Sequence, residues 1–455
     1  MAKPFHITRR EFVGSAVASA AIGTTGQASI KQAKPPNILF ILADDLGWGD
    51  LSCYGRPDYT TPNLDAFAKQ GIRFTNAYSA SPVCTPTRCG LLTGRYPART
   101  PVGLQEPLIA KKELGRNAEM LGLAPEHPTL SSLIKKSGYE TALFGKWHLG
   151  YLPKFGPNHH GFDKFFGILS GGAGFFTHKD TAGEIDLFEN ETPVERIGYI
   201  TDLLTDRAVE FISGKHERPF YLSLHYTAPH WPWEGPGDAK SASVIKLGYG
   251  GFTAGGSSKT YAAMMKSLDY GIGKVLRAVK SSGIERDTLV IFTSDNGGER
   301  FSYNWPFTGQ KFQLYEGGIR VPAIVKWPGV IAAGRTTDQV AITMDWTATM
   351  IAAAKGQADP SYPLDGIDLL PLMSGKRTEF ERTLFWRHAA GQDAVRSGKW
   401  KYLKFNELEF LFDLDDDVRE QADFKQTNPE EFRKLKAEFA EWQKTVLPRL
   451  QRPPA

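Results

Sequence analysis

The chain has 455 residues, of which 41% are hydrophobic and 23% charged, with a formal net charge of +4 and three cysteines. This composition is typical of a globular protein with one large and one smaller domain, or two comparable domains. Residues 1–33 account for +3 of the net charge, which leaves a nearly neutral remainder without an electrostatic footprint for nucleic acid. Three cysteines cannot build a disulfide framework, and we expect Cys53 and Cys89 to be small core residues.

The first 33 residues have the features of a processing segment. Thr8-Arg9-Arg10-Glu11-Phe12-Val13 precedes a weakly apolar run from Gly14 to Gly23. This pattern resembles a twin-arginine export signal, and it predicts that the bacterial twin-arginine machinery exports the protein to the periplasm or the medium. The alternative is an ordinary basic tail, and the cleavage site is left open. No stretch approaches the roughly 20 apolar residues of a membrane span, so we expect no integral membrane segment.

Apolar strand patterns alternate with helical patterns along most of the chain. The main predicted strands cover 37–43, 140–148, 220–225 and 288–294, and the main predicted helices cover 61–71, 84–94, 129–136 and 264–283. This alternation predicts an α/β fold with a large, mainly parallel sheet sandwiched by helices. The Gly- and Ser-rich stretch 248–258 between two of these elements is typical of a mobile surface loop.

The character of the chain changes beyond about residue 375. Short strand patterns typical of an antiparallel meander are followed by a charged helix over about 429–447. We therefore expect three parts: a signal segment over 1–33, a catalytic domain over 34–375, and a smaller C-terminal α+β domain, antiparallel sheet plus helix, over 376–455.

Polar residues stand at the C-terminal ends of four predicted strands of the large sheet. They are Asp44 and Asp45, Lys146 and His148, His225 with His230 beyond it, and Asp295 and Asn296. Ligands of parallel sheets bind beyond the C-terminal ends of the strands, so these residues predict a single site.

Four of these residues are hard oxygen donors: Asp44, Asp45, Asp295 and Asn296. Neighbouring strand residues point to opposite faces, so Asp44 and Asp45 can share a metal only where the strand breaks into a turn, and Leu46-Gly47 supplies that break. Oxygen ligands favour Ca²⁺ or Mg²⁺ over Zn²⁺, and the residues do not choose between the first two. The alternatives are an acidic pair that caps the next segment, and one that binds Mg²⁺ in a phosphoryl-transfer domain.

A cysteine and an arginine face an expected helix N-terminus. In Cys84-Thr85-Pro86-Thr87-Arg88, Cys84 lies at or next to the N-cap and Arg88 follows on the same helix face. The free amide groups of the first turn favour an anion, although a buried cysteine near a surface arginine is the simpler alternative.

Four further candidates are basic side chains. Lys146 and His148 are two residues apart on an expected extended segment, so we place them on one face, where lysine can neutralise an oxyanion and histidine can move a proton. His230 in an aromatic-rich loop and Lys311 do not stand out by periodicity.

Several blocks carry a family resemblance. Cys84 to Arg95 resembles the signature C-x-P-[ST]-R-x-x-L-L-T-G-R of the type I, formylglycine-dependent sulfatases, arylsulfatase-like members of the alkaline-phosphatase-like superfamily. The other matching blocks are Asp44 to Leu51, Gly145 to Gly150, Ser294 to Gly298 and Thr308 to Lys311. The resemblance extends from Asn37 to about Leu414 and departs at Cys89-Gly90, where the family usually has small residues such as Ala or Ser.

The resemblance implies a modified nucleophile on a metal. A formylglycine-generating enzyme would convert Cys84 to formylglycine (3-oxoalanine), whose hydrate would attack sulfur. One Ca²⁺ would be bound by Asp44, Asp45, Asp295, Asn296 and the modified position 84. The remaining implied roles are charge stabilisation by Lys146, Lys311 and His230, protonation of the leaving alcohol by His230 or Lys311, proton removal by His148, and support of position 84 by Arg88.

The implied function is hydrolysis of a sulfate monoester by a sulfuric ester hydrolase. We expect a sulfated carbohydrate as substrate, with His178 and Trp233 as candidate contacts because aromatic and polar residues cluster between the motifs. The alternatives are a formylglycine-dependent phosphodiesterase or phosphonate monoester hydrolase, and a non-catalytic sulfated-glycan-binding protein. The particular sulfated substrate and the oligomeric state are left open.

Overall fold

The computed structural model describes residues 34–242, 247–389 and 391–450, and the described residues from Pro35 on form one compact unit. The expected export signal lies outside the described residues. Within the described ranges, no helix combines the length and the apolar character that crossing a bilayer requires.

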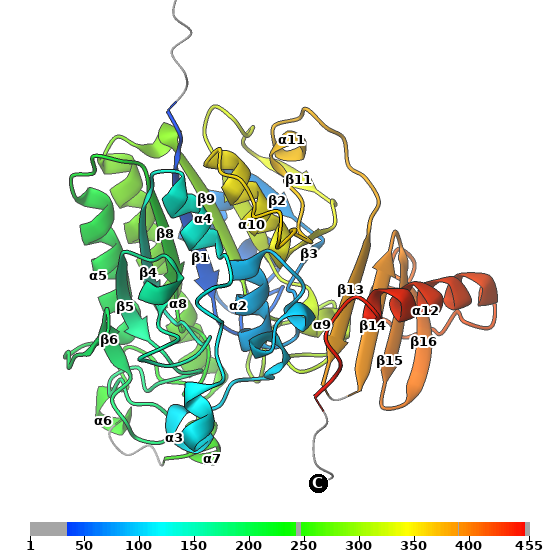
Figure 1. Cartoon of the computed structure of the whole chain (residues 1–455), viewed down its shortest axis with the longest axis horizontal. Helices are drawn as coiled ribbons and strands as arrows, with labels where there is room; N and C mark the ends of the chain where they lie inside the picture. Colours follow the sequence, from blue (N-terminus) through cyan, green and yellow to red (C-terminus); the bar gives the residue numbers. More distant parts are fainter. Residues whose placement is uncertain (1–33, 243–246, 390, 451–455) are drawn as a thin grey trace, which may run out of the picture. The chain divides into compact units, whose positions relative to one another are not determined.

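A ten-stranded sheet forms the larger part of the structure (Figure 1). In spatial order its strands are β11 (Arg335–Thr337), β2 (Ile72–Phe74), β10 (Ala323–Lys326), β9 (Thr288–Ser294), β1 (Asn37–Ala43), β8 (Phe220–His225), β4 (Glu140–Gly145), β5 (Lys164–Ile168), β6 (Leu187–Glu189) and β7 (Thr192–Pro193). The central strands β9, β1, β8, β4 and β5 are parallel, and antiparallel strands flank them. The prediction of a large, mainly parallel sheet is confirmed.

Helices cover both faces of this sheet because its central strands are apolar on both sides. The helices of the structure are α1 (Pro62–Lys69), α2 (Cys84–Thr93), α3 (Lys111–Leu114), α4 (Leu130–Lys136), α5 (Ile200–Ser213), α6 (Ala239–Ala242), α7 (Tyr249–Phe252), α8 (Ser258–Ser281), α9 (Glu316–Ile319), α10 (Thr343–Ala353), α11 (Leu370–Met373) and α12 (Pro429–Gln443). Helices α1, α5 and α8 pack on one face, and α2, α4, α10 and α11 pack on the other.

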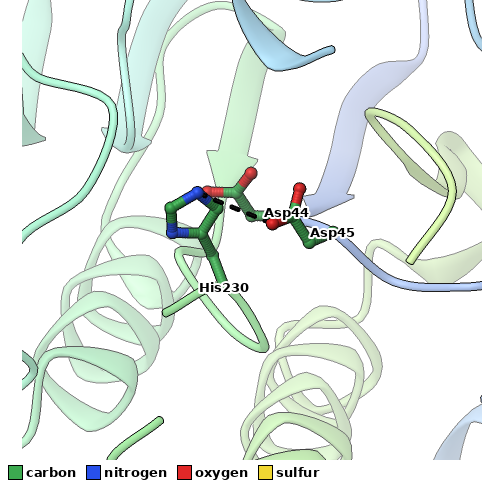
Figure 2. Close-up of side chains that lie close together, drawn as sticks. All are labelled: Asp44, Asp45 and His230. Carbon is green, nitrogen blue, oxygen red and sulfur yellow. Dashed lines mark ion pairs between the residues drawn. The ribbon is translucent and has the colours of Figure 1, made fainter. Parts of the chain in front are cut away.

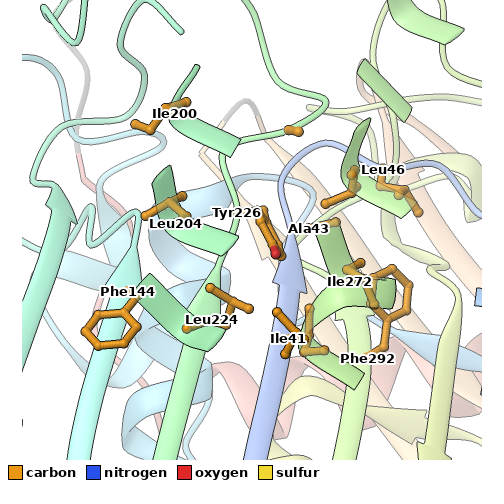
Figure 3. Close-up of a cluster of buried hydrophobic side chains, with 14 of the residues drawn as sticks. Ile41, Ala43, Leu46, Phe144, Ile200, Leu204, Leu224, Tyr226, Ile272 and Phe292 are labelled. Carbon is orange, nitrogen blue, oxygen red and sulfur yellow. The ribbon is translucent and has the colours of Figure 1, made fainter. Parts of the chain in front are cut away.

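Alternate residues of β1 enter the two cores. Ile41 and Ala43 lie in the core under α5 and α8, where Figure 3 shows them beside Leu204 and Ile272. Phe40 points the other way, into the core under α2 and α10. Because β1 is buried on both faces, its polar continuation is fixed firmly at the end of the strand.

A second, four-stranded antiparallel sheet carries α12 (Figure 1). Its strands in order are β13 (Thr383–His388), β14 (Gln392–Ser397), β15 (Trp400–Phe405) and β16 (Leu408–Asp413). A short pair, β3 (Ala77–Tyr78) and β12 (Ala341–Ile342), contributes Tyr78 and Ile342 to the core beneath this sheet. The antiparallel sheet and final helix are as predicted, and the domain boundary at 375/376 stays a prediction.

Candidate active site

The C-terminal ends of β1 and β9 carry the acidic centre of the site. Asp45 follows β1 in the left-handed region, with φ of 61°, so the chain turns there and the backbone amide of Asp45 donates to Asp295 Oδ1 at 3.2 Å. This is the turn that the predicted metal pair requires. Asn296 Nδ2 donates to Asp45 Oδ1 at 2.7 Å, which joins the two strand ends.

Four cationic or basic side chains surround these carboxylates. Asp44 Oδ2 lies 2.7 Å from Lys146 Nζ, and Asp45 Oδ2 lies 2.7 Å from Lys311 Nζ. His230 Nε2 lies 3.6 Å from Asp45 Oδ2, as Figure 2 shows. Arg88 donates to Asp295 Oδ2 from Nη2 at 2.8 Å. All of these side chains are at least 97% buried, so their charges interact strongly.

The charges shift one another's pKa values. Burial opposes the charge of Asp45, but Lys311, and next His230 and Lys146, hold the pKa of its carboxyl below the ordinary value. Burial, and next the negative charge of Asp44, raises the pKa of Asp295. The two neighbouring carboxylates therefore have pKa shifts in opposite directions, set by burial and by the charges around each of them.

The centre has features that fit a bound hard cation. Among the described residues, Asp44 Oδ1 and Asn296 Oδ1 are buried oxygens without a hydrogen-bond partner. Asp44, Asp45 and His230 each place one ligand atom within 4.8 Å of the others (Figure 2). Because hard cations prefer oxygen, the donor set of Asp44, Asp45, Asp295 and Asn296 fits Ca²⁺ or Mg²⁺ better than a set that includes the imidazole of His230.

Cys84 lies at the first position of α2, after Val83 as N-cap, and Gly94 in the left-handed region ends the helix. All ten residues of α2 are buried, and the exposed fraction of Cys84 is 1%. Burial raises the pKa of the Cys84 thiol, although Lys146 and Lys311 oppose the shift. An unmodified Cys84 is therefore a protonated thiol at neutral pH, which is a poor nucleophile.

Arg88 supports the centre from behind. In addition to Asp295, its Nη1 group donates to the carbonyl of Lys146 at 2.9 Å. His225, at the end of β8, lies against the same carbonyl and is held by Ser223 Oγ at 2.7 Å. Arg88 thus ties α2 to the ends of β4 and β9, and the structure uses it mainly to fix a carboxylate of the centre.

His148 lies in the site by a different route from the one predicted. Strand β4 ends at Gly145, and His148 has φ of 59°, so the prediction that Lys146 and His148 share a face of one extended segment is wrong. Its Nε2 group lies 2.8 Å from the carbonyl of Leu108. A carbonyl only accepts, so Nε2 carries the proton and Nδ1, which has no partner among the described residues, is the free base.

Two glycines pack directly on the catalytic histidine candidates. A Cβ atom on Gly171 would lie 2.6 Å from Cε1 of His148, and one on Gly172 would lie 3.1 Å from Cε1 of His230. Asp186 fixes this segment by accepting from the amides of Leu169 and Ser170 at 3.1 and 3.0 Å. The glycine requirement comes from this close approach, which no sequence pattern indicates.

A pocket of about 350 Å³ opens over the centre. Its lining consists of Cys84, His148, His230 and Lys311, the segment Pro107 to Ala110, Glu113, Ser170 to Gly172, Thr181, Trp231, Tyr249 and Phe312. Four of the predicted catalytic residues thus face one cavity, whereas Arg88, Lys146 and the carboxylates lie beneath it. Burial, and next the nearby lysines, lowers the pKa values of His148 and His230 well below the ordinary value.

The structure does not bring His178 or Trp233 into this pocket. His178 Nε2 lies 3.1 Å from the carbonyl of Gly198, and its exposed fraction is 3%. Trp233 packs its ring 5.1 Å from that of Phe301, and its exposed fraction is 7%. The pocket contacts that the sequence did not single out include Glu113, Ile109 and Tyr249. Tyr249 begins α7 inside the stretch expected to be a mobile loop.

Comparisons with known proteins agree with this geometry. The family model described as Sulfatase matches residues 36–356, and the model described as N-sulphoglucosamine sulphohydrolase, C-terminal, matches residues 306–445. N-acetylgalactosamine-6-sulfatase of Mus musculus is 35% identical over 389 residues, which cover 81% of this chain and 72% of that protein. Arylsulfatase A of Bos taurus is 36% identical over 414 residues, which cover 82% of this chain and 76% of that protein.

Solved structures give the same result. Ps i-CgsB in complex with k-i-k-neocarrahexaose has a TM-score of 0.79 and 31% identity, covering 90% of this chain and 93% of that one. The phosphonate monoester hydrolase of Agrobacterium radiobacter, with a TM-score of 0.64 and 20% identity over 90% of this chain and 96% of that one, shares the fold alone.

The sheet, its helices and the polar strand ends define an enzyme of the alkaline-phosphatase-like superfamily. Within that superfamily the chain belongs to the sulfatase family, and it is a sulfatase.

Proposed function

We propose that this sulfatase removes sulfate from a sulfated carbohydrate, with formylglycine at position 84 and one calcium ion held by Asp44, Asp45, Asp295 and Asn296. The observation that carries the proposal is a pair of buried oxygens without a hydrogen-bond partner, Asp44 Oδ1 and Asn296 Oδ1, beside Cys84 and two lysines. Of the two, Asp44 Oδ1 lies 3.5 Å from Arg88 Nη2. Hydrated formylglycine would supply an oxygen nucleophile, and calcium would supply a Lewis acid for the sulfate oxygens.

The proposed role of each residue depends on whether it lines the pocket or lies beneath it. Lys311 and His230 line the pocket, so they face the sulfate group, and either could give a proton to the leaving alcohol. Although burial opposes its charge, Asp45 raises the pKa of Lys311, so this ammonium stays charged and can stabilise an anionic oxygen. Lys146 supports the same charge from below through its contact with Asp44.

His148 is the proposed base because its free nitrogen is defined by its contacts. The Leu108 carbonyl holds the proton at Nε2, and the lowered pKa keeps Nδ1 unprotonated at neutral pH. His148 and Cys84 line the same pocket, so Nδ1 is available to take a proton from the group at position 84.

The proposed maturation and export rest on the sequence motifs. A formylglycine-generating enzyme modifies Cys84, and the twin-arginine machinery exports the protein to the periplasm or the medium. The carbohydrate preference is supported by the relatives, one named for N-acetylgalactosamine and one solved with a neocarrahexaose.

The decisive experiment uses protein coexpressed with a formylglycine-generating enzyme. It should release sulfate from at least one member of a panel of defined sulfated saccharides, and chelation should abolish that release until Ca²⁺ is restored. Preferred hydrolysis of a phosphodiester or phosphonate ester would replace the sulfate assignment with the phosphonate monoester hydrolase alternative. An intact mass that shows unmodified Cys84 in the native host would favour the non-catalytic glycan-binding alternative.

A further inference from the structure

The outer wall of the active-site pocket is apolar and partly exposed. Tyr249 and Ile109, which line it, have exposed fractions of 56% and 46%. The Tyr249 ring stands edge-on to Trp231, with ring centroids 5.4 Å apart and an interplanar angle of 86°. Exposed large apolar side chains around a pocket mark the place where a ligand covers them. A sugar ring offers such side chains its apolar face.

The charges of the same wall are few. Among the described lining residues, Lys311 is the one lysine or arginine, and it is bound to Asp45 at 2.7 Å. The described wall therefore offers a cation to the sulfate at the centre and none to a second anionic group beside it.

Helix α3 turns its acidic residue toward the pocket and its basic residues away. Glu113 lines the pocket, whereas Lys112 pairs with Glu184 at 3.0 Å and Lys111 donates to the Leu152 carbonyl at 2.9 Å. Both lysines line a separate hollow with Leu152 and Glu184. A carboxylate at the mouth repels a second sulfate or a uronate carboxylate, and the exposed position of Glu113 makes this effect moderate.

We propose that the pocket selects a sugar whose single anionic group is the sulfate ester to be removed. Tyr249 and Ile109 hold the ring of that sugar, and Glu113 excludes sugars with a second sulfate or a carboxylate next to the first. This inference rests on the proposed function and specifies its substrate class.

The test compares mono- and disulfated forms of N-acetylgalactosamine and of galactose as matched pairs. For wild-type modified enzyme, kcat/KM should be about tenfold or more higher for the monosulfated member of a pair. Glu113→Lys should raise kcat/KM for the disulfated member about fivefold to tenfold relative to the monosulfated one. Glu217→Lys is the control, because Glu217 is an exposed residue just before the N-terminal end of β8, whereas the site lies at the C-terminal ends of the strands. Tyr249→Ala should lower kcat/KM for every saccharide about tenfold.

Binding to the unmodified protein separates this inference from the proposed reaction. Calorimetric titration with the same saccharides should show tighter binding of the monosulfated members and a smaller difference for Glu113→Lys, whether or not the protein turns over. Equal or stronger binding of the disulfated members, no binding of any member, or an unchanged ratio in Glu113→Lys would overturn the inference. Preserved binding selectivity without sulfate release from modified protein would overturn only the proposed reaction.

Discussion

Two buried charge clusters in this protein look alike in composition and differ in completeness. In the second cluster, Lys401 Nζ lies 2.8 Å from both Glu316 Oε1 and Glu420 Oε1. Glu316 Oε2 accepts from Tyr78 and lies 3.2 Å from Arg320 Nη1, and Glu420 Oε2 accepts from the amide of Glu316. Each carboxylate oxygen lies near a donor or a cation, although Glu420 Oε1 meets Lys401 without hydrogen-bond geometry and Glu420 has a φ of 55°. The cluster joins β15 to α9.

In the active-site cluster, several buried polar atoms have no hydrogen-bond partner among the described side chains. Asp44 Oδ1, Asn296 Oδ1 and His148 Nδ1 have no hydrogen-bond partner among the described residues. Asp45 and His148 also have positive φ angles, 61° and 59°, which cost energy for residues other than glycine. Buried charge alone therefore does not mark a site. The second cluster also has an unpartnered oxygen and a positive φ at Glu420, so the larger number of unpartnered atoms and the adjoining pocket distinguish the active site.

The comparison predicts the largest effect at Cys84. Cys84→Ala should lower turnover by roughly a thousandfold or more relative to modified wild-type protein, because the reacting group is lost. Stability should stay nearly unchanged, since Ala fills most of the same space. Steady-state kinetics and thermal unfolding measure the two quantities, and activity within tenfold of wild type would contradict the assignment of position 84.

Removing one oxygen donor should affect metal and activity together. Asp45→Asn keeps the shape of the side chain but halves its acceptor capacity, so calcium affinity and kcat/KM should each fall about a hundredfold. Metal analysis of the purified protein and kinetics check this. Asp287→Asn, an exposed change beside the start of β9, serves as control. Full activity of Asp45→Asn after exhaustive chelation would show that the centre uses no metal.

The second cluster should behave in the opposite way. Lys401→Met leaves the carboxylates of Glu316 and Glu420 buried without their shared cation, which should cost about 3–5 kcal/mol of unfolding free energy. Turnover per folded molecule should remain within about twofold. Denaturant unfolding and active-site-normalised kinetics measure this, with Lys404→Met, whose side chain is partly exposed, as control. A stable but inactive Lys401→Met protein would contradict the assignment of the second cluster to stability rather than to turnover.

A smaller effect is expected where the glycine segment contacts His148. Gly171→Ala forces the imidazole away from its position, and kcat should fall about tenfold with little change in KM. The matched change Gly237→Ala, at an exposed glycine with open space around its Cβ position, should leave kcat unchanged. Equal effects of the two substitutions would remove the positioning role of Gly171.

The smallest expected effect is on the pH profile. Burial, and next Lys146, lowers the pKa of His148, so its neutral form persists below the ordinary histidine value of 6.5. A base acts in its neutral form, and the acid limb of the kcat/KM profile should therefore lie below pH 6.5. An acid limb above pH 7 that Lys146→Met leaves in place would contradict this assignment.

Three central strands were predictable to the residue because their apolar runs are buried on both faces, whereas β4 ends at Gly145 and not at the predicted residue 148. The structure places β1, β8 and β9 at 37–43, 220–225 and 288–294, as predicted. The polar strand ends were predictable for the same reason, because a fixed strand fixes the residue that follows it. Asp45 confirms the expected turn with its positive φ.

The pocket wall was not predictable, because loop side chains take their direction from segments far away in sequence. Tyr249 lies in a stretch whose glycines and serines indicate only a loop, and Trp231 holds it in place. His178 and Trp233 have the composition of ligand contacts, but neighbouring loops bury them. No sequence pattern identifies Gly171. Only the close approach of His148 to its Cβ position shows why this residue is glycine.

The burial of Cys84 sets an order of events in the life of the chain. With α2 buried along all ten residues and Cys84 only 1% exposed, a small ester can enter the pocket but a protein catalyst cannot surround this segment. The proposed oxidation of Cys84 by another enzyme would therefore have to happen while residues 84–94 are still unfolded. The fraction of active protein would then depend on how fast Cys84 is converted compared with how fast α2 docks. Slower folding gives the maturation enzyme more time, so a slow-folding variant would carry a larger active fraction.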